Sequence, residues 1–206
     1  MARSGKIIAT TASAAWLALL CAPAQGAQET QGVQGAQGAQ GADRAPPPIR
    51  LAVFDMELDD FTAGGPIAGE SPAETARLQR MTGLARELLA QSGLFELVDT
   101  RAAAGPMVAG HWLRKCNGCD ADAAAALGAQ MSFVGFFRKI SVMEQTLELR
   151  IRDARTGALV HVSQTDLRGE TDESWSRALK FLIRYELVEP ETARRRREGL
   201  AARADR

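Results

Sequence analysis

Two cysteines three positions apart are the residues whose type and spacing most directly suggest chemistry. Cys116 and Cys119 flank Asn117-Gly118, a pair that readily forms a turn and can bring the two sulfur atoms together. In an oxidising compartment two such thiols usually form a disulfide. The ring that it closes is very small, so it should stabilise the fold by less than the roughly 3 kcal/mol expected for a 15-residue loop. The spacing predicts a structural disulfide between Cys116 and Cys119.

Other chemistries remain open for these two cysteines. The motif precedes a helix, so Cys116 could act as the attacking thiolate of a thiol–disulfide oxidoreductase, with Cys119 as the resolving thiol. Against this, no strand leads directly into the motif, and Asp120 places a negative charge beside the thiols. Zinc needs four ligands and only His111 is near, while haem attachment requires a histidine where Asp120 stands. We expect no metal and no cofactor.

Four carboxylates follow an apolar run at residues 51–54: Asp55, Glu57, Asp59 and Asp60. In open α/β sheets ligands gather beyond the carboxyl ends of the strands, so these residues are candidates for binding a ligand or a divalent cation such as calcium. Paired carboxylates could also do acid–base work, but no partner residue points to a substrate. The plainer interpretation is a solvated strand exit and loop.

The pair His111-Trp112 lies in a glycine-flanked loop and could line a binding surface. A tryptophan in such a place more often fills the edge of a core, and we favour that interpretation. Ser174 and Ser176 do not lie in a strained elbow turn with a histidine partner, and His161 has no recognisable acid–base partner. We therefore expect a binding protein rather than an enzyme.

The elements that must position these residues follow from periodicity and capping signals. Residues 51–54 predict a strand, Ser71-Pro72-Ala73-Glu74 predicts a helix start, Gly93 predicts its end, and residues 95–98 predict a second strand. Trp175 belongs to the apolar face of a C-terminal helix. Further elements are a helix at 123–127 capped by Asp120 or Asp122 and strands at 131–137, 146–152 and 158–167. The C-terminal helix that carries Trp175 begins at Thr171 or Asp172.

This order predicts an α/β domain with an α+β tendency. We expect a mixed sheet of about five strands, parallel in its N-terminal part and closed by an antiparallel C-terminal hairpin, with helices packed on it. Residues 62–69 read as a mobile loop. The domain should span residues 49–189, followed by an Arg-rich tail at 190–206 that is either a frayed helix or disordered.

The first residues have the pattern of a signal peptide. Arg3 and Lys6 precede an apolar segment at residues 7–20, and small residues predict cleavage after Gly26. A lipoprotein signal through Cys21 is the alternative, but Leu20 is too large for it; a retained anchor is the third possibility. Residues 27–48 contain a Gln-Gly repeat and then Pro46-Pro47-Pro48, which predicts a disordered linker.

Several spaced segments resemble a family of secreted bacterial proteins known only as a domain of unknown function. They are residues 51–55, 92–99, 127–130 and 153–157, the Cys116–Cys119 motif, and Asp172-Glu173-Ser174-Trp175-Ser176-Arg177. More distantly, the strand–helix–strand unit is similar to the α/β domain of TolB-type and curli-secretion-type envelope proteins. The resemblance implies a periplasmic role in assembly or binding, and it carries over no catalytic residue.

We therefore expect a secreted periplasmic accessory protein that binds an envelope protein, with the oxidoreductase as the alternative. The tail arginines, Arg194 to Arg197 with Arg203 and Arg206, suggest weak contact with anionic lipid, worth about 1 kcal/mol per basic residue near such a surface. A solvated terminal helix is the plainer interpretation. The whole chain has 25 basic and 25 acidic residues, so no bulk charge points to nucleic acid.

Overall fold

The fold is built around strand β4 (Met131–Lys139), which has paired neighbours on both of its edges. The computed structural model describes residues 46–204. The expected signal peptide, the linker up to residue 45 and Arg206 lie outside the described residues. Within them, no helix is both long and apolar enough to cross a membrane.

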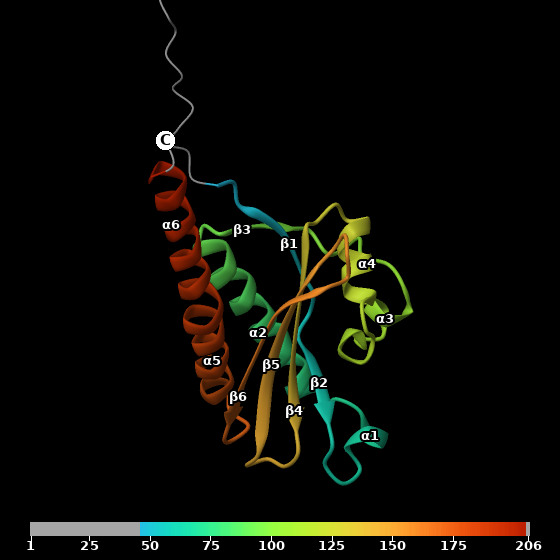
Figure 1. The fold of residues 1–206 in the computed structure, drawn as a ribbon. Coiled ribbons are helices and arrows are strands. Elements are labelled where there is room, and N and C mark those ends of the chain that lie inside the picture. Colours follow the sequence, from blue (N-terminus) through green and yellow to red (C-terminus); the bar gives the residue numbers. More distant parts are fainter. Residues whose placement is uncertain (1–45, 205–206) are drawn as a thin grey trace, which may run out of the picture. The chain divides into compact units, whose positions relative to one another are not determined.

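The other strands of the described residues are β1 (Ile49–Val53), β2 (Glu57–Asp60), β3 (Phe95–Val98), β5 (Gln145–Asp153) and β6 (Leu159–Leu167). With β4 they form one mixed sheet in the order β3-β1-β4-β5-β6, and β2 pairs beside β4 beyond the end of β1 (Figure 1). The pairs β1–β3, β1–β4 and β2–β4 are parallel, whereas β4–β5 and β5–β6 are antiparallel. This confirms the predicted mixed sheet and its C-terminal hairpin.

Strand β2 is a strand that the sequence did not predict. β1 and β2 pair one after the other along the same edge of β4, because Val53 lies opposite Phe133 and Glu57 lies opposite Phe136. Between them the chain breaks its pairing, and Met56 packs against Gly135, where a Cβ atom would have no room. From Glu57 to Asp60 the acidic stretch is therefore a strand of the sheet and not a solvated exit loop, whereas Asp55 before it is exposed.

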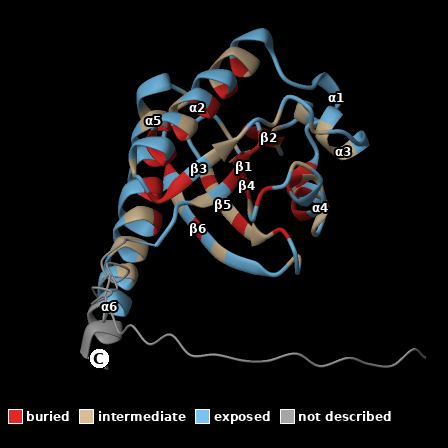
Figure 2. Cartoon of the chain, turned by 90° about the horizontal axis from the view of Figure 1, so that it is seen from above, coloured by how far each residue is buried: buried red, intermediate tan, exposed pale blue. Residues whose placement is uncertain are grey.

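A large layer of helices covers one face of the sheet. It consists of α2 (Pro72–Gln91), α5 (Asp172–Phe181) and the π-helical stretch η2 (Leu182–Val188). Trp175 is fully buried there, as predicted, and stacks on Phe137 with ring centroids 3.7 Å apart. Its Nε1 donates to Gln145 Oε1 at 2.9 Å, so its one polar atom is satisfied. Figure 2 shows the buried sides of α2 and α5 turned toward the sheet.

The predicted helix signals are confirmed at both ends of α2. Ser71 and Glu74 form a reciprocal capping box, and Gly93 has a left-handed φ of 69°. Thr171 is the N-cap of α5. After η2 the helix continues as α6 (Glu189–Ala204), so the Arg-rich tail is helical as far as Ala204.

A smaller layer covers part of the opposite face. It contains α3 (Pro106–Ala109), the 3-10 turn η1 (Leu113–Lys115) and α4 (Cys119–Ala126). Its core unites Ala52 and Phe54 of the β1 segment with Leu113, Ala124 and Val134. Gly118, at φ 113°, precedes α4 in place of the predicted aspartate caps. Residues 62–69 include a one-turn helix, α1 (Gly65–Ala68), where a loop was expected.

Candidate functional site

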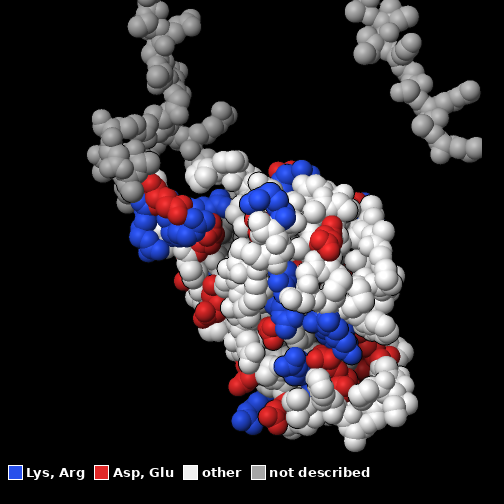
Figure 3. Space-filling view, turned by 45° about the vertical axis from the view of Figure 1, so that its right-hand side comes forward, with Lys and Arg blue, Asp and Glu red and all other residues white. Residues whose placement is uncertain are grey.

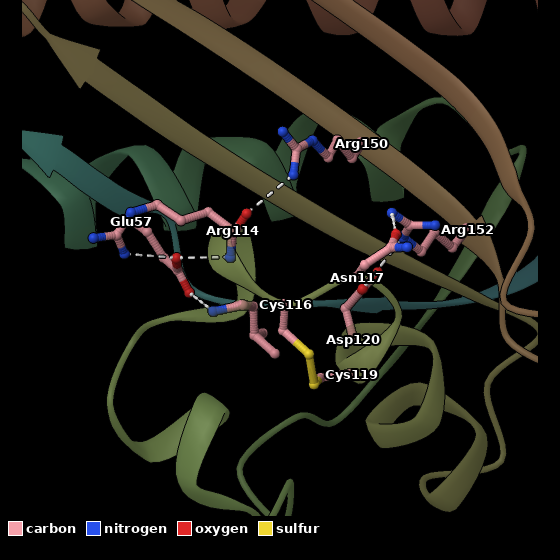
Figure 4. The surroundings of a disulfide bond; sticks show 9 residues. Glu57, Arg114, Cys116, Asn117, Cys119, Asp120, Arg150 and Arg152 are labelled. Carbon is pink, nitrogen blue, oxygen red and sulfur yellow. Dashed lines mark hydrogen bonds and ion pairs between the residues drawn. A yellow bond between two sulfur atoms is a disulfide. The ribbon is translucent and has the colours of Figure 1, made fainter.

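The acidic strand β2 and the segment that carries the cysteines lie side by side, although about fifty residues separate them in the chain. We call residues 110–119 the disulfide loop. Glu57, only 1% exposed, accepts hydrogen bonds from the backbone N–H groups of Leu113 (2.8 Å) and Arg114 (3.1 Å). Its carboxylate also accepts from Arg114 Nη1 at 2.9 Å (Figure 4). One buried carboxylate thus holds the start of η1 on the sheet.

A second carboxylate of β2 extends this ion-pair network. Asp59 lies 3.3 Å from Arg114 Nε and 3.4 Å from Arg138 Nε. The guanidinium groups of Arg138 and Arg150 lie 5.6 Å and 4.8 Å from the ring centroid of Phe136. Ion pairing and hydrogen bonds offset the free-energy cost of burying these charges. Removing one partner leaves the other charge buried and unpaired, which destabilises the fold.

The rest of the disulfide loop is held by strand β5. Arg150 Nη1 donates to the carbonyl oxygen of Arg114 at 3.1 Å, and Arg152 Nη2 donates to Asn117 Oδ1 at 2.8 Å. Asp120, 2% exposed, accepts from Ser132 Oγ and lies 3.5 Å from Arg152 Nε. Figure 4 shows Arg150 and Arg152 reaching the loop from the sheet. Hence the loop has fixed contacts on both sides of the cysteines.

The predicted disulfide between Cys116 and Cys119 is present in the structure. Both cysteines are half-buried, and Cys119 is the first residue of α4. The sequence did not identify Arg114, Arg150 or Arg152 as contacts of this loop. The alternation in β5 does predict that Arg150 and Arg152 share one face, and in the structure that face is partly covered.

The four predicted carboxylates do not share one environment. Glu57 and Asp59 are buried in ion pairs, so a solvated exit is wrong for them. Asp55 is exposed and pairs with Arg86 at 3.0 Å, and Asp60 accepts from the backbone N–H of Thr62. Among residues 46–204, no three His, Cys, Asp or Glu side chains are grouped so as to hold a metal ion. A ligand-binding role for the four residues stays a prediction.

His111 and Trp112 both face solvent. Trp112 is 54% exposed, so the expectation that it fills the edge of the core is wrong. The next residue, Leu113, takes that position and is only 4% exposed. His111 has a left-handed φ of 53°, which is rare for a residue other than glycine and turns the chain sharply at this point.

A small cavity does bring several of the predicted residues together. It has a volume of about 60 Å³, and Asp55, Glu57, Thr100 and His111 contribute to its lining. It lies beyond the carboxyl end of β1, where the sequence places a ligand site. Small-molecule pockets usually measure about 300–1,000 Å³, so this one suits water or a small ion and not an organic substrate.

The other histidine and the serines have structural neighbours. His161 is half-buried, which lowers its pKa, and its Nε2 lies 3.1 Å from Ser163 Oγ. Ser174 completes the cap of α5 with Thr171, and Ser176 Oγ donates to the carbonyl oxygen of Glu173 within the same helix. These contacts explain the residues without a reaction.

The chain shows distant similarity to several solved structures. The C-terminal domain of LpoB from Salmonella enterica is 19% identical with a TM-score of 0.41, covering 62% of this chain and 87% of that one. PelC from Paraburkholderia phytofirmans is 11% identical with a TM-score of 0.41, covering 68% and 93%. TolB from Acinetobacter baumannii is 12% identical with a TM-score of 0.42, covering 71% of this chain and 29% of that one.

A comparison with curated protein sequences gave no match. A family model does match, over residues 49–187, which include every strand, the disulfide loop and α5. That family is DUF3280, described as "Protein of unknown function (DUF2380)". The match agrees with the unknown-function family that the sequence motifs resemble. Since it spans more than half of the chain, the chain belongs to this family.

Proposed function

We propose that this protein is a periplasmic accessory protein that binds another envelope protein through the surface around Trp112. The observation that carries the proposal is the position of this side chain. It is 54% exposed on a loop whose next two backbone N–H groups are bonded to a buried carboxylate. The loop is therefore held in place while its largest apolar side chain faces solvent.

This arrangement has the physical properties of a protein-binding surface. Tryptophan is enriched among the residues that dominate interface energies. Binding is tighter when the contacting loop is already ordered, because less conformational entropy is lost on association. The disulfide and the contacts from β5 order this loop before any partner arrives.

The proposed compartment rests on two supports. The N-terminal segment has the composition of a signal peptide. A disulfide is typical of proteins in oxidising compartments such as the bacterial periplasm. An envelope partner is also what the resemblance of the sequence motifs implies.

Site-specific photocrosslinking tests the proposal. A photoreactive phenylalanine analogue is placed at Trp112 in the full chain, and in a control at Ala125, which is exposed on α4. We expect irradiation of intact cells to give a discrete adduct at position 112 and none at 125. The adduct should be lost when Glu57→Ala releases the loop. Equal adducts at both positions, or none at either, would contradict the proposal.

One observation bears on the oxidoreductase alternative, which is that Cys119, and not the expected attacking thiol Cys116, begins helix α4. A helix N-terminus stabilises a thiolate. The fixed contacts on both sides of the cysteines favour a structural disulfide instead. A measured reduction potential distinguishes the two functions, as described in the Discussion.

A further inference from the structure

A groove of about 480 Å³ lies between helix α6 and the end of the sheet where β1 begins. Its floor consists of apolar side chains from the strands and η2: Ile49, Phe95, Met131, Ile151, Val160 and Leu187. The volume falls within the range of about 300–1,000 Å³ that is usual for small-molecule sites. The groove shares no lining residue with the disulfide loop, so any role it has is separate from the function proposed above.

The floor of this groove is not fully covered by the protein itself. Val160 is 50% exposed, and Ile49 and Met131 are half-buried. The side of α6 that borders the groove is mostly charged: Pro190 is its one apolar lining residue, beside Glu191, Arg194 and Arg197. An apolar floor opposite a charged wall is poorly matched by the chain alone, and it would be matched by a molecule with one apolar and one charged part.

The charges on the wall indicate the sign of that molecule. Arg194 is already paired with Glu191 at 2.7 Å and also with Glu198. Arg197 makes no ion pair with any side chain that the structure describes. His161 and the carboxylate of Glu186 also line the groove, and Glu186 precedes Arg197 by eleven residues of the same continuous helix, about 16 Å at the usual rise. The uncompensated positive charge therefore lies at the Arg197 end.

We propose that the groove binds a medium-chain fatty acid, with its hydrocarbon chain on the apolar floor and its carboxylate at Arg197. Guanidinium groups bind carboxylates through two parallel hydrogen bonds, which suits a single anionic head group. Leu187 on the floor and Arg197 are ten residues apart along the helix, a distance of about 15 Å at the usual helical rise. An extended acyl chain of moderate length covers that distance, whereas an inorganic anion would leave the floor exposed.

Displacement of a fluorescent acyl probe tests this assignment. The purified protein is titrated with 11-(dansylamino)undecanoic acid, which is then displaced by dodecanoate, dodecanol or dodecyltrimethylammonium below their micellar concentrations. Arg197→Glu is compared with Arg196→Glu, because the two arginines are neighbours with the same change in net charge. Arg197 lines the groove and Arg196 does not. Both arginines border a second depression, which is formed by α6 and the adjoining Val188.

We expect dodecanoate to displace the probe and the other two compounds to do so weakly. Arg197→Glu should weaken dodecanoate binding by about tenfold, since one charge-assisted contact is lost. Arg196→Glu should bind dodecanoate like the wild type. Val160→Asp places a charge on the apolar floor and should weaken dodecanoate binding, as Arg197→Glu does. Melting curves of all variants test whether the fold is intact. Arg197 is exposed on α6, so its substitution should leave the core unchanged.

Three results would overturn the assignment. Equal displacement by all three compounds would show that the carboxylate is not recognised. Equal losses in Arg196→Glu and Arg197→Glu would place binding on the outer side of α6. Tighter binding of a peptide with an apolar, free C-terminal residue than of dodecanoate would assign the groove to a protein terminus instead.

Discussion

The carboxylate of Glu57 lies 2.9 Å from the guanidinium of Arg114, and this pair joins strand β2 to the disulfide loop. The Glu57 side chain is 1% exposed and that of Arg114 is 9% exposed, so the pair is almost excluded from water. Their positions in the chain are 57 residues apart, yet the contact fixes both the register of a short strand and the path of the loop.

The first prediction concerns this pair. Glu57→Ala leaves Arg114 buried and also removes the acceptor of two backbone N–H groups, so we expect a loss of about 3–5 kcal/mol in unfolding free energy. Urea denaturation followed by circular dichroism measures it. Asp55→Ala is the control, because its exposed pair with Arg86 should contribute no more than about 1 kcal/mol. Similar losses of unfolding free energy in the two variants would show that the buried pair stabilises the fold no more than the exposed pair does.

Acid should destabilise the fold through Glu74. Partial burial by itself would raise the pKa of this carboxyl, but hydrogen bonds from Lys139 and Ser71 lower the pKa to about 2. The Glu74 carboxylate is therefore protonated at a lower pH in the folded state than in the unfolded state, where its pKa is near 4.5. The stabilisation is complete above that pH and is lost as the pH falls from 4.5 to 2, with an amplitude of at most about 3 kcal/mol.

Unfolding free energies measured between pH 6 and pH 2 check this, at roughly half-unit steps, in the wild type and in Glu74→Gln. The variant should lose less stability across that interval, because its side chain does not titrate. Glu87→Gln, exposed on the same helix, should follow the wild type. A variant curve parallel to that of the wild type would exclude Glu74 as the source.

The two tryptophans of the domain should differ in access to solvent. Trp112 is 54% exposed, whereas Trp175 is fully buried against Phe137. With Trp16 replaced by phenylalanine, Trp112→Phe leaves a shielded fluorophore and Trp175→Phe leaves an exposed one. Acrylamide should quench the second protein strongly and the first one weakly. Equal quenching would place Trp112 in the core, as the sequence pattern favours.

The disulfide should have the potential of a structural bond. We expect the Cys116–Cys119 pair to equilibrate below about −300 mV in redox buffers, measured by thiol trapping and mass spectrometry. A value between about −120 and −270 mV, where exchange catalysts lie, would instead support the oxidoreductase. The Cys116→Ser, Cys119→Ser double variant should lose less than about 3 kcal/mol of stability, because the bond closes a very short loop.

Gly135 should resist substitution. A Cβ atom there would lie 2.5 Å from the sulfur of Met56 and 3.0 Å from Leu149 Cδ2. Gly135→Ala must displace Met56 at the break between β1 and β2, and we expect a cost of about 1–3 kcal/mol by denaturation. Gly83→Ala, with no heavy atom near the new methyl group, is the control and should be neutral or slightly stabilising.

Local patterns were sufficient for the elements that depend on neighbouring residues. The capping box of α2, the left-handed Gly93 and the alternation in β5 and β6 each need only a few adjacent positions, and all appear in the structure. The face that buries Trp175 follows from helical spacing in the same way.

The parts that the sequence did not reveal depend on distant partners. Glu57 and Asp59 suggest a wet loop until Arg114 and Arg138 are placed beside them. Asp120 has the chemistry of a helix cap, but it turns inward because Ser132 and Arg152 bind it. For Trp112 and Leu113 the pattern contains two apolar neighbours, and only packing decides which one is buried.

The continuous helix from α5 through α6 holds the end of α6 away from the sheet. Helix α6 adds 16 residues beyond η2, which is about 24 Å of rigid rod at the usual rise. In Figure 1 this rod extends past the sheet at the end where β1 begins. Figure 3 shows acidic and basic side chains intermixed along it, so the rod carries no single-sign field. A label or fusion attached after α6 would thus stand off from the sheet and leave the Trp112 surface unobstructed.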